Sequence, residues 1–383
     1  MKVAHPKSLG SSAVPACEIQ VFTGAYSPDM ITPAVSGRSR ERVVRICDSA
    51  GDARTLRLRL LEEVRQVVRF DAYAWLLTDP ETSVGSAPLA DVPCLPELPR
   101  LIRLKYLTDV NRWTTLRSAP VALLYEATSG EPSRSLLWRD LLDSYGIGDV
   151  ASLVFRDRFG CWGFLDLWRP GTVARFSSAE AAYLTGITEP VTLALRRSQA
   201  NAFAARDPGD ARRLGPVVLL LSPDLEVRGQ TPQTQEYLRI LVPPAEDRPP
   251  IPASAYNVAA QLLAVEAGVD QNPPSARVHL SHGLWVTLRA ARIGDAGPAT
   301  ERDIAVTIEE ASPPERVALF ARAFGLSPRE NELLGHLASG TDTRELARRM
   351  FLSEHTVQDH LKSIFAKTSA RNRRTLLSRA LGT

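Results

Sequence analysis

Three polar side chains near the C-terminus have the types and spacing needed to recognise DNA bases. Gln358 and Lys362 stand four residues apart and Asp359 lies between them, so a helix would carry them on one side. Glutamine can pair with adenine N6 and N7, lysine can donate to guanine O6 and N7, and aspartate can accept from cytosine N4. These residues therefore predict base readout in the major groove.

A second group of polar side chains lies around these three and suits the DNA backbone. Its members are Arg344, His355, Thr356, His360 and Lys367. Contacts to phosphates or to the edge of a groove fix the position of a protein on DNA rather than its sequence preference. Asp359 has a second interpretation, in which it pairs with Arg344 or Lys362 or repels wrong approaches of the backbone.

Short helices must position these side chains, and capping signals predict them. The first helix begins with a capping box from Ser327 to Glu330, has proline at its first helical position and ends at Gly340. A second helix is predicted over 344–350 and a third over about 354–368. Two short helices, a tight turn and an exposed polar face on the later helix form a helix-turn-helix.

The spaced residues of this segment resemble a known family. They are Leu326-Ser327-Pro328-Arg329-Glu330, Leu333-Leu334, Gly340, Glu345-Leu346-Ala347, Leu352-Ser353, Thr356-Val357, His360, Lys367 and Asn372-Arg373. The segment resembles the LuxR-type, or GerE-type, DNA-binding domain of bacterial transcription regulators. The resemblance implies four helices, double-stranded DNA as the partner and RNA polymerase as a further partner. Ser369-Ala370 departs from it, because the family often has glycine and then valine there.

The charge of the chain is concentrated in the same segment. Residues 327–383 hold 10 Lys and Arg against 6 Asp and Glu, a net of +4, whereas the whole chain nets +3 and the remainder therefore −1. A local positive balance is typical of a surface that meets phosphates.

The composition argues against a membrane protein, a secreted protein and a zinc protein. No apolar run reaches the about 18 residues of a membrane span, and the N-terminal residues lack the continuous apolar segment of a secretory signal. The four cysteines are scattered, without the pairing typical of zinc sites. We therefore expect a cytoplasmic protein with no membrane contact and no metal, and the excess of Arg over Lys suggests a bacterial source.

Three further regions are predicted before the helix-turn-helix. Residues 1–39, rich in Ser, Pro, Gly and Ala, are predicted to be a disordered leader. Residues 40–205 follow the order helix, strand, irregular segment, hairpin and long closing helix, which resembles a GAF domain. The hairpin has its turn at Asp157 to Gly160, and a capping box at Ser177 opens the closing helix, which Pro190 is expected to kink or break.

Residues 214–311 are predicted to form two strands, helices and three further strands, an order that resembles a PAS domain. A helix over 315–324 then leads into the DNA-binding domain, residues 315–383. The predicted fold class is α+β multidomain, with GAF-like and PAS-like antiparallel-sheet domains followed by an all-α four-helix LuxR-type DNA-binding domain.

The sequence contains no arrangement typical of catalysis. A P-loop, a nucleophile elbow and an H-E-x-x-H motif are missing, and Asp71 and Lys105 lack the spacing of a phosphate-accepting receiver domain. We therefore expect neither enzyme activity nor a cofactor.

A few upstream side chains allow two interpretations. His279 and His282 could hold haem, although histidines on sheets are more often plain polar residues. Trp138, Trp162 and Trp168 could line a small-molecule pocket or fill the core. The ligand-binding residues stay unknown at this point.

The function predicted is a sequence-specific DNA-binding transcriptional regulator, controlled by ligand or partner binding to the GAF/PAS-like region. We expect a homodimer, with the helix over 178–205 as a candidate dimer contact, and a small molecule as effector. The alternative is an enzyme, or an interaction protein that does not bind DNA, carrying a helix-turn-helix-like domain. The effector, the operator, and the choice between activation and repression do not follow from the sequence.

Overall fold

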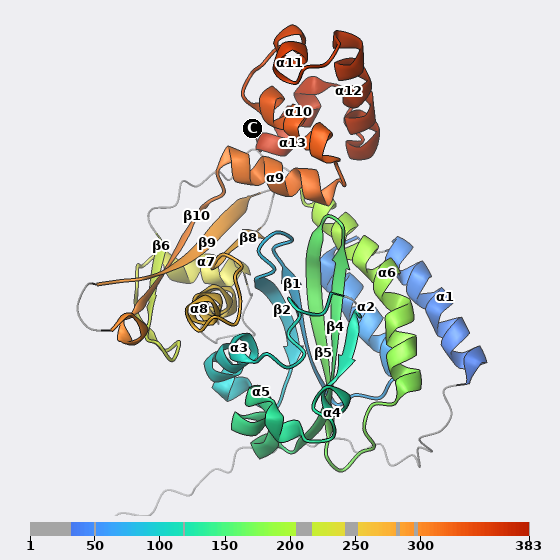
Figure 1. The fold of residues 1–383 in the computed structure, drawn as a ribbon, viewed down its shortest axis with the longest axis vertical. Coiled ribbons are helices and arrows are strands. Elements are labelled where there is room, and N and C mark those ends of the chain that lie inside the picture. Colours follow the sequence, from blue (N-terminus) through green and yellow to red (C-terminus); the bar gives the residue numbers. More distant parts are fainter. Residues whose placement is uncertain are drawn as a thin grey trace, which may run out of the picture. The chain divides into compact units, whose positions relative to one another are not determined.

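The chain forms two antiparallel sheets followed by a C-terminal group of helices (Figure 1). The computed structural model describes residues 32–49, 51–117, 119–203, 217–241, 252–280, 284–294 and 298–382. Two antiparallel sheets before a helical region confirm the predicted fold class. Within the described ranges no helix has both the length and the apolar character needed to cross a membrane.

The first sheet, sheet A, has five strands in the order β2-β1-β5-β4-β3. They are β1 (Ala72–Thr78), β2 (Gly85–Asp91), β3 (Val121–Leu123), β4 (Ile147–Asp157) and β5 (Gly160–Pro170). The predicted hairpin is β4 and β5. Its turn requires glycine, because Gly160 has φ of +153° and a Cβ there would lie 2.3 Å from the carbonyl oxygen of Pro80.

Helices cover both faces of sheet A (Figure 1). Because side chains alternate along a strand, Trp75 and Leu165 pack with α1 (Pro33–Ser49), α2 (Ala53–Arg65) and α6 (Ser178–Asn201). Their neighbours Leu76 and Phe164 pack on the other side. That side carries α3 (Leu98–Leu107) and α5 (Leu136–Asp140), and the short α4 (Leu124–Ala127) follows β3.

Helix α1 corrects the predicted leader, because the helix begins at Pro33 and so includes residues that were expected to be disordered up to 39. The cause is tertiary packing. Ser39 is fully buried, and its hydroxyl lies 2.8 Å from the Tyr183 hydroxyl and 2.5 Å from Glu63 Oε1. The predicted leader before residue 32 lies outside the described residues.

Helix α6 has the predicted capping box, in which Ser177 Oγ accepts from the backbone N–H of Glu180 and the Glu180 carboxylate accepts from the Ser177 N–H. A kink or a break was predicted at Pro190; the break does not occur, since the helix runs through this residue. Ile187 and Val191 on either side are buried against sheet A, and this packing outweighs the missing proline N–H. Residues 204–205, predicted to belong to this helix, lie outside the described residues.

The second sheet, sheet B, has the strand order β7-β6-β10-β9-β8. Its strands are β6 (Val217–Leu221), β7 (Val227–Gln230), β8 (Ser275–His279), β9 (Trp285–Arg292) and β10 (Ile304–Glu310). Two helices, α7 (Thr234–Leu241) and α8 (Ala253–Glu266), lie between β7 and β8 in the chain.

Helix α8 contacts both sheet regions. It packs against β8, β9 and β10 of sheet B and also against β2 and α3. Ala255, Ala259 and Ala260 are fully buried. Small side chains allow this close approach to two neighbours at once.

The C-terminal helices are α9 (Pro313–Ala323), α10 (Pro328–Ala338), α11 (Thr343–Arg349), α12 (Glu354–Thr368) and α13 (Arg373–Leu381). Leu333, Leu337, Leu346, Val357 and Ile364 are fully buried between them. The predicted capping box at Ser327 is present, and Ser353 caps α12 by accepting from the N–H of Thr356. Ser369, which departs from the family pattern, has φ of +52°, a value that favours glycine.

Candidate DNA-binding surface

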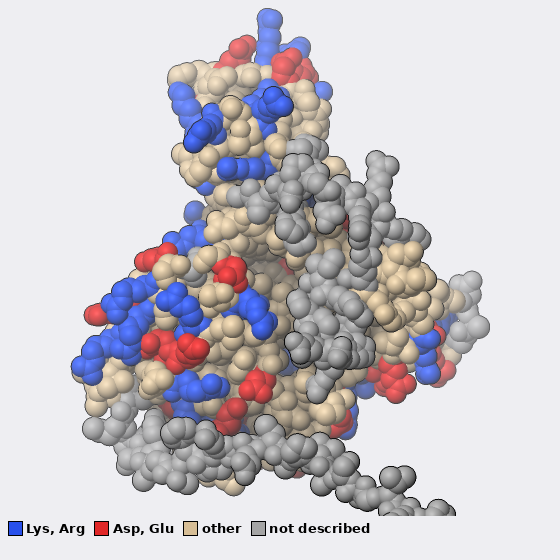
Figure 2. All heavy atoms as spheres, turned by 180° about the vertical axis from the view of Figure 1, so that it is seen from behind, with Lys and Arg blue, Asp and Glu red and all other residues tan. Residues whose placement is uncertain are grey.

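Helix α12 carries an exposed polar face above a buried one. Gln358, Asp359 and Lys362 are exposed, whereas Val357 and Leu361 are buried in the domain core. The three side chains predicted to read bases therefore lie together on the solvent side of one helix. Figure 2 shows Lys and Arg side chains spread over the surface of the C-terminal helices.

Asp359 pairs within its own helix. Its Oδ1 lies 3.2 Å from Lys362 Nζ and its Oδ2 lies 3.5 Å from His355 Nε2. The hydrogen bond from Lys362 lowers the pKa of Asp359. This geometry agrees with the interpretation in which Asp359 pairs with Lys362. Gln358 has no hydrogen-bond partner among the described residues.

The remaining predicted contacts lie at both ends of this face. Arg344 in α11 and His355 in the first turn of α12 are exposed, and Thr356 and His360 are partly exposed. Within the described ranges Arg344 forms no ion pair. A guanidinium with no intramolecular partner remains available for phosphate.

Lys367 has an internal partner. Its Nζ lies 2.6 Å from Glu330 Oε2, and Ser363 Oγ donates to Glu330 Oε1 at 2.6 Å. Burial alone would raise the pKa of Glu330, but bonds from Lys367, Ser363 and Ser327 lower it to about 2. The buried carboxylate thus joins the start of α10 to the C-terminal half of α12.

Phe351, in the turn before α12, was not predicted as a site residue. Its residue surface is 95% exposed and its φ is +55°. A non-glycine residue with positive φ costs of order 1 kcal/mol and needs support from its surroundings.

Comparison with known proteins decides the nature of this surface. Residues 325–380 match the model of a family described as bacterial regulatory proteins, luxR family. These residues form a LuxR-family helix-turn-helix domain. The resemblance drawn from the spaced residues is thereby confirmed for the C-terminal segment.

The chain is also similar to named relatives. The chain is 33% identical over 127 residues to the probable HTH-type transcriptional regulator GfsR of Streptomyces halstedii, covering 33% of this chain and 44% of that protein. It is 42% identical over 53 residues to the probable csgAB operon transcriptional regulatory protein of Salmonella typhimurium, covering 14% of this chain and 24% of that protein. It is 41% identical over 54 residues to the monoamine regulon transcriptional regulator of Klebsiella aerogenes, again 14% and 24%. The chain thus spans less than half the length of each relative.

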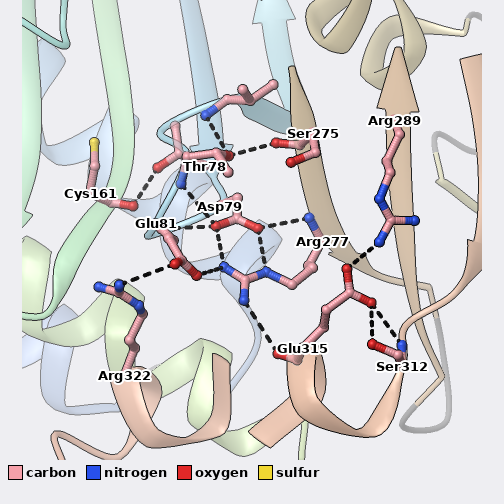
Figure 3. Close-up of polar contacts among 12 residues, drawn as sticks. Thr78, Asp79, Glu81, Cys161, Ser275, Arg277, Arg289, Ser312, Glu315 and Arg322 are labelled. Carbon is pink, nitrogen blue, oxygen red and sulfur yellow. Dashed lines mark hydrogen bonds and ion pairs between the residues drawn. The ribbon is translucent and has the colours of Figure 1, made fainter. Parts of the chain in front are cut away.

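A buried ion pair joins sheet A to sheet B beside the helix that leads to the LuxR-family domain (Figure 3). Asp79, directly after β1, accepts from the backbone N–H of Arg277 at 2.8 Å and from its Nε and Nη2 at 2.7 Å each. The Asp79 side chain is 1% exposed. Burial alone would raise its pKa, but the bonds from Arg277 hold the pKa below its usual value.

The same arginine ties α9 to this pair. Arg277 Nη1 donates to the carbonyl oxygen of Glu315 at 3.3 Å, and Nη2 donates to Glu81 Oε2 at 2.8 Å. Glu81 Oε1 in turn lies 3.6 Å from Arg322 Nη2. Helix α9 therefore contacts residues of both sheet regions (Figure 3).

Aromatic rings add to this contact. The ring of Phe203, just after α6, stacks on Trp285 of β9 at 4.8 Å and meets Phe320 of α9 edge-on at 5.2 Å. The backbone N–H of Ala311 donates to the Trp285 carbonyl at 2.8 Å. Phe203 thus lies between strand β9 and helix α9.

Of the two histidines considered for haem, His279 lies within the described residues. His279 ends β8 with its ring 5.1 Å from that of Trp285, and His282 lies outside the described residues. Within the described ranges no group of three or more His, Cys, Asp or Glu side chains could hold a metal ion.

The three tryptophans differ in their surroundings. Trp138 donates its indole N–H to the Ile147 carbonyl at 2.8 Å, and Trp162 donates to Asp157 Oδ1 at 2.9 Å. Trp168 lines a cavity, and its indole N–H has no partner in the described structure. Trp162 lines another cavity, so two of the three tryptophans lie where a ligand pocket was considered.

Proposed function

We propose that the chain is a sequence-specific DNA-binding transcriptional regulator whose helix α12 enters the major groove. One observation carries the proposal. In a LuxR-family domain, the exposed face of α12 presents Gln358 and Lys362 to solvent. A helix that only had to be packed has no need for this grouping of long donors and acceptors.

The roles we propose follow the geometry. Gln358 and Lys362 read base edges, and Asp359 reads a base when Lys362 turns away from it. The side chains proposed to hold phosphates or the groove edge are Arg344, His355, Thr356, His360 and Lys367. Lys367 would contact phosphate with the N–H donors of its ammonium that do not bind Glu330.

We further propose that the upstream region, residues 40–205 and 214–311, controls DNA binding by a small-molecule effector or a protein partner. Each part has its own five-stranded sheet, and both contact α9 through the Asp79–Arg277 pair and its neighbours. A homodimer with α6 as a contact would bind an operator with two-fold symmetry, and RNA polymerase would be the further partner.

Replacing Lys362 by alanine tests the recognition face. We expect specific binding to weaken by about 1–3 kcal/mol, because one base contact is lost. Gel-shift titrations on an operator found by selection from random duplexes measure it. Arg329→Ala is the matched control, since it removes the same charge from an exposed position of α10 and should change specific affinity far less.

Equal affinity of Lys362→Ala and the wild type on that operator would refute the assignment of Lys362. Failure of the folded wild type to select any duplex would refute the proposal as a whole. A non-DNA-binding interaction protein or an enzyme would then be the better description. A footprint that lacks two-fold symmetry would remove the dimer from the proposal.

A further inference from the structure

An apolar cavity lies between sheet A and helix α3. Its volume is about 240 Å³, and its walls include Leu76 of β1, Phe164 and Trp168 of β5, and Ile102 of α3. Small-molecule sites for drug-sized ligands run from about 300 to 1,000 Å³, so an occupant of this cavity is smaller than those.

One part of the cavity wall is polar and electrically balanced. Lys105 Nζ lies 2.6 Å from Asp166 Oδ2, with the two side chains 12% and 5% exposed. Ser152 Oγ donates to Asp166 Oδ1 at 2.8 Å. Each oxygen of the Asp166 carboxylate therefore has one partner, and its charge balances that of the ammonium.

The ammonium of Lys105 has more donors than this contact uses. A lysine can donate three hydrogen bonds, and the other described contacts of its Nζ are the faces of Phe164 at 5.8 Å and Trp113 at 6.0 Å. An acceptor in the cavity can take up the donors of Lys105 that this contact leaves over.

These features select the charge of an occupant. A carboxylate or phosphate would enter an apolar space beside Asp166 with no uncompensated cation to balance it, and burying such a charge is costly. A neutral oxygen needs no such balance and accepts from the free donors of Lys105. An apolar body matches the remaining walls.

We propose that this cavity binds a small uncharged molecule with an apolar body and one oxygen acceptor, held by the Lys105 ammonium. The proposal rests on the control function proposed above and names the site and chemical class of its effector. Helix α8 supplies Asn257 and Ala253 to the wall and packs on sheet B. An occupant therefore touches both sheet regions, which is the position from which it can affect α9.

Three probes of similar size test the chemistry on the full chain. Acetophenone has a neutral acceptor, benzoate carries a charge, and ethylbenzene has no acceptor. Isothermal titration calorimetry should show acetophenone binding about tenfold or more tighter than either of the others, a difference of about 1.4 kcal/mol. Equal affinities for the three, or no binding of acetophenone at millimolar concentration, would overturn the proposal.

Two variants locate the site. Ala74→Phe fills part of the cavity from β1 and should abolish acetophenone binding. The double variant Lys105→Met/Asp166→Asn removes both charges together and should bring acetophenone to the affinity of ethylbenzene. A wild-type-like melting temperature confirms that each variant is folded, and unchanged acetophenone binding in both folded variants would refute the site.

A gel shift with and without acetophenone separates this inference from the proposed function. A calorimetric difference between the probes together with unchanged DNA binding keeps the site and refutes effector control through it. Loss of specific DNA binding in Lys362→Ala bears on the recognition helix alone, so the two failures can be told apart.

Discussion

Sheets A and B have the same strand order but differ in how closely helices pack on them. Numbered along the chain within each sheet, both read 2-1-5-4-3. On sheet B, α8 presents the fully buried residues Ala255, Ala259 and Ala260. On sheet A, the side that faces α3 borders a cavity of about 240 Å³. Strand order therefore does not determine whether a sheet holds a ligand space; the size and polarity of the covering side chains do.

The comparison also explains why Lys105 and Asp166 lie where they do. A buried charged pair needs hydrogen-bond partners at fixed geometry for its polar atoms. The Asp79–Arg277 pair meets this demand with three hydrogen bonds to the carboxylate from one arginine. Lys105 keeps donors in reserve, so one pair is a structural joint and the other is suited to recognition.

Breaking the Asp79–Arg277 pair between the two sheets should have the largest effect on the free energy of unfolding. Arg277→Met leaves Asp79 buried without a partner and should lower the free energy of unfolding by about 3–5 kcal/mol, as measured by urea unfolding. Arg289→Met is the matched control, because the Arg289 side chain is 46% exposed and exposed pairs contribute about 0–1 kcal/mol. A similar loss in both variants would contradict a special role for the buried pair.

The stability difference between the wild type and Arg277→Met should depend on pH. The pKa of Asp79 is lowered in the folded chain, so its stabilising contribution is present above the unfolded value and is lost as the pH falls through the folded value. The stability gap between wild type and Arg277→Met should be full at neutral pH and narrow below about pH 4, near the ordinary aspartate pKa. Unfolding curves of both proteins from pH 7 to pH 3 measure it. A gap that widens in acid would refute the assignment.

Replacing one alanine beside each sheet by leucine compares the helix packing on sheets A and B directly. Ala259→Leu adds volume where α8 is fully buried and should destabilise by about 1–3 kcal/mol, whereas Ala74→Leu extends into the cavity and should cost less. Melting temperatures of the two variants rank the sites. If Ala74→Leu is the more destabilising, the space beside sheet A is not available to an added group.

Local signals in the sequence predicted the C-terminal helices well. The capping residues Ser327 and Ser353 act on their own helices, and the third helix expected over about 354–368 is α12. The exposed face of α12 follows from helical spacing alone. Pairing of Lys367 with Glu330 was not predicted, because the two residues belong to different helices.

The upstream features that escaped prediction depend on contacts distant in sequence. Strand β2 contains Gly85, Pro88 and Asp91, residue types that are uncommon in strands, and it forms by pairing with β1. The Asp79–Arg277 pair joins residues 198 positions apart. The cavity likewise combines residues from β1 to α8, and no spacing rule could bring them together.

The connection between β10 and α9 limits how a signal can reach DNA. Strand β10 ends at Glu310 and α9 begins at Pro313, so two residues, Ala311 and Ser312, join them. The first is bonded to β9 through its N–H and the second caps α9. A connection of two bonded residues cannot act as a flexible linker that releases the LuxR-family domain. We therefore expect regulation to act through α9, because a small rotation of this helix would change the orientation of the LuxR-family domain that follows it.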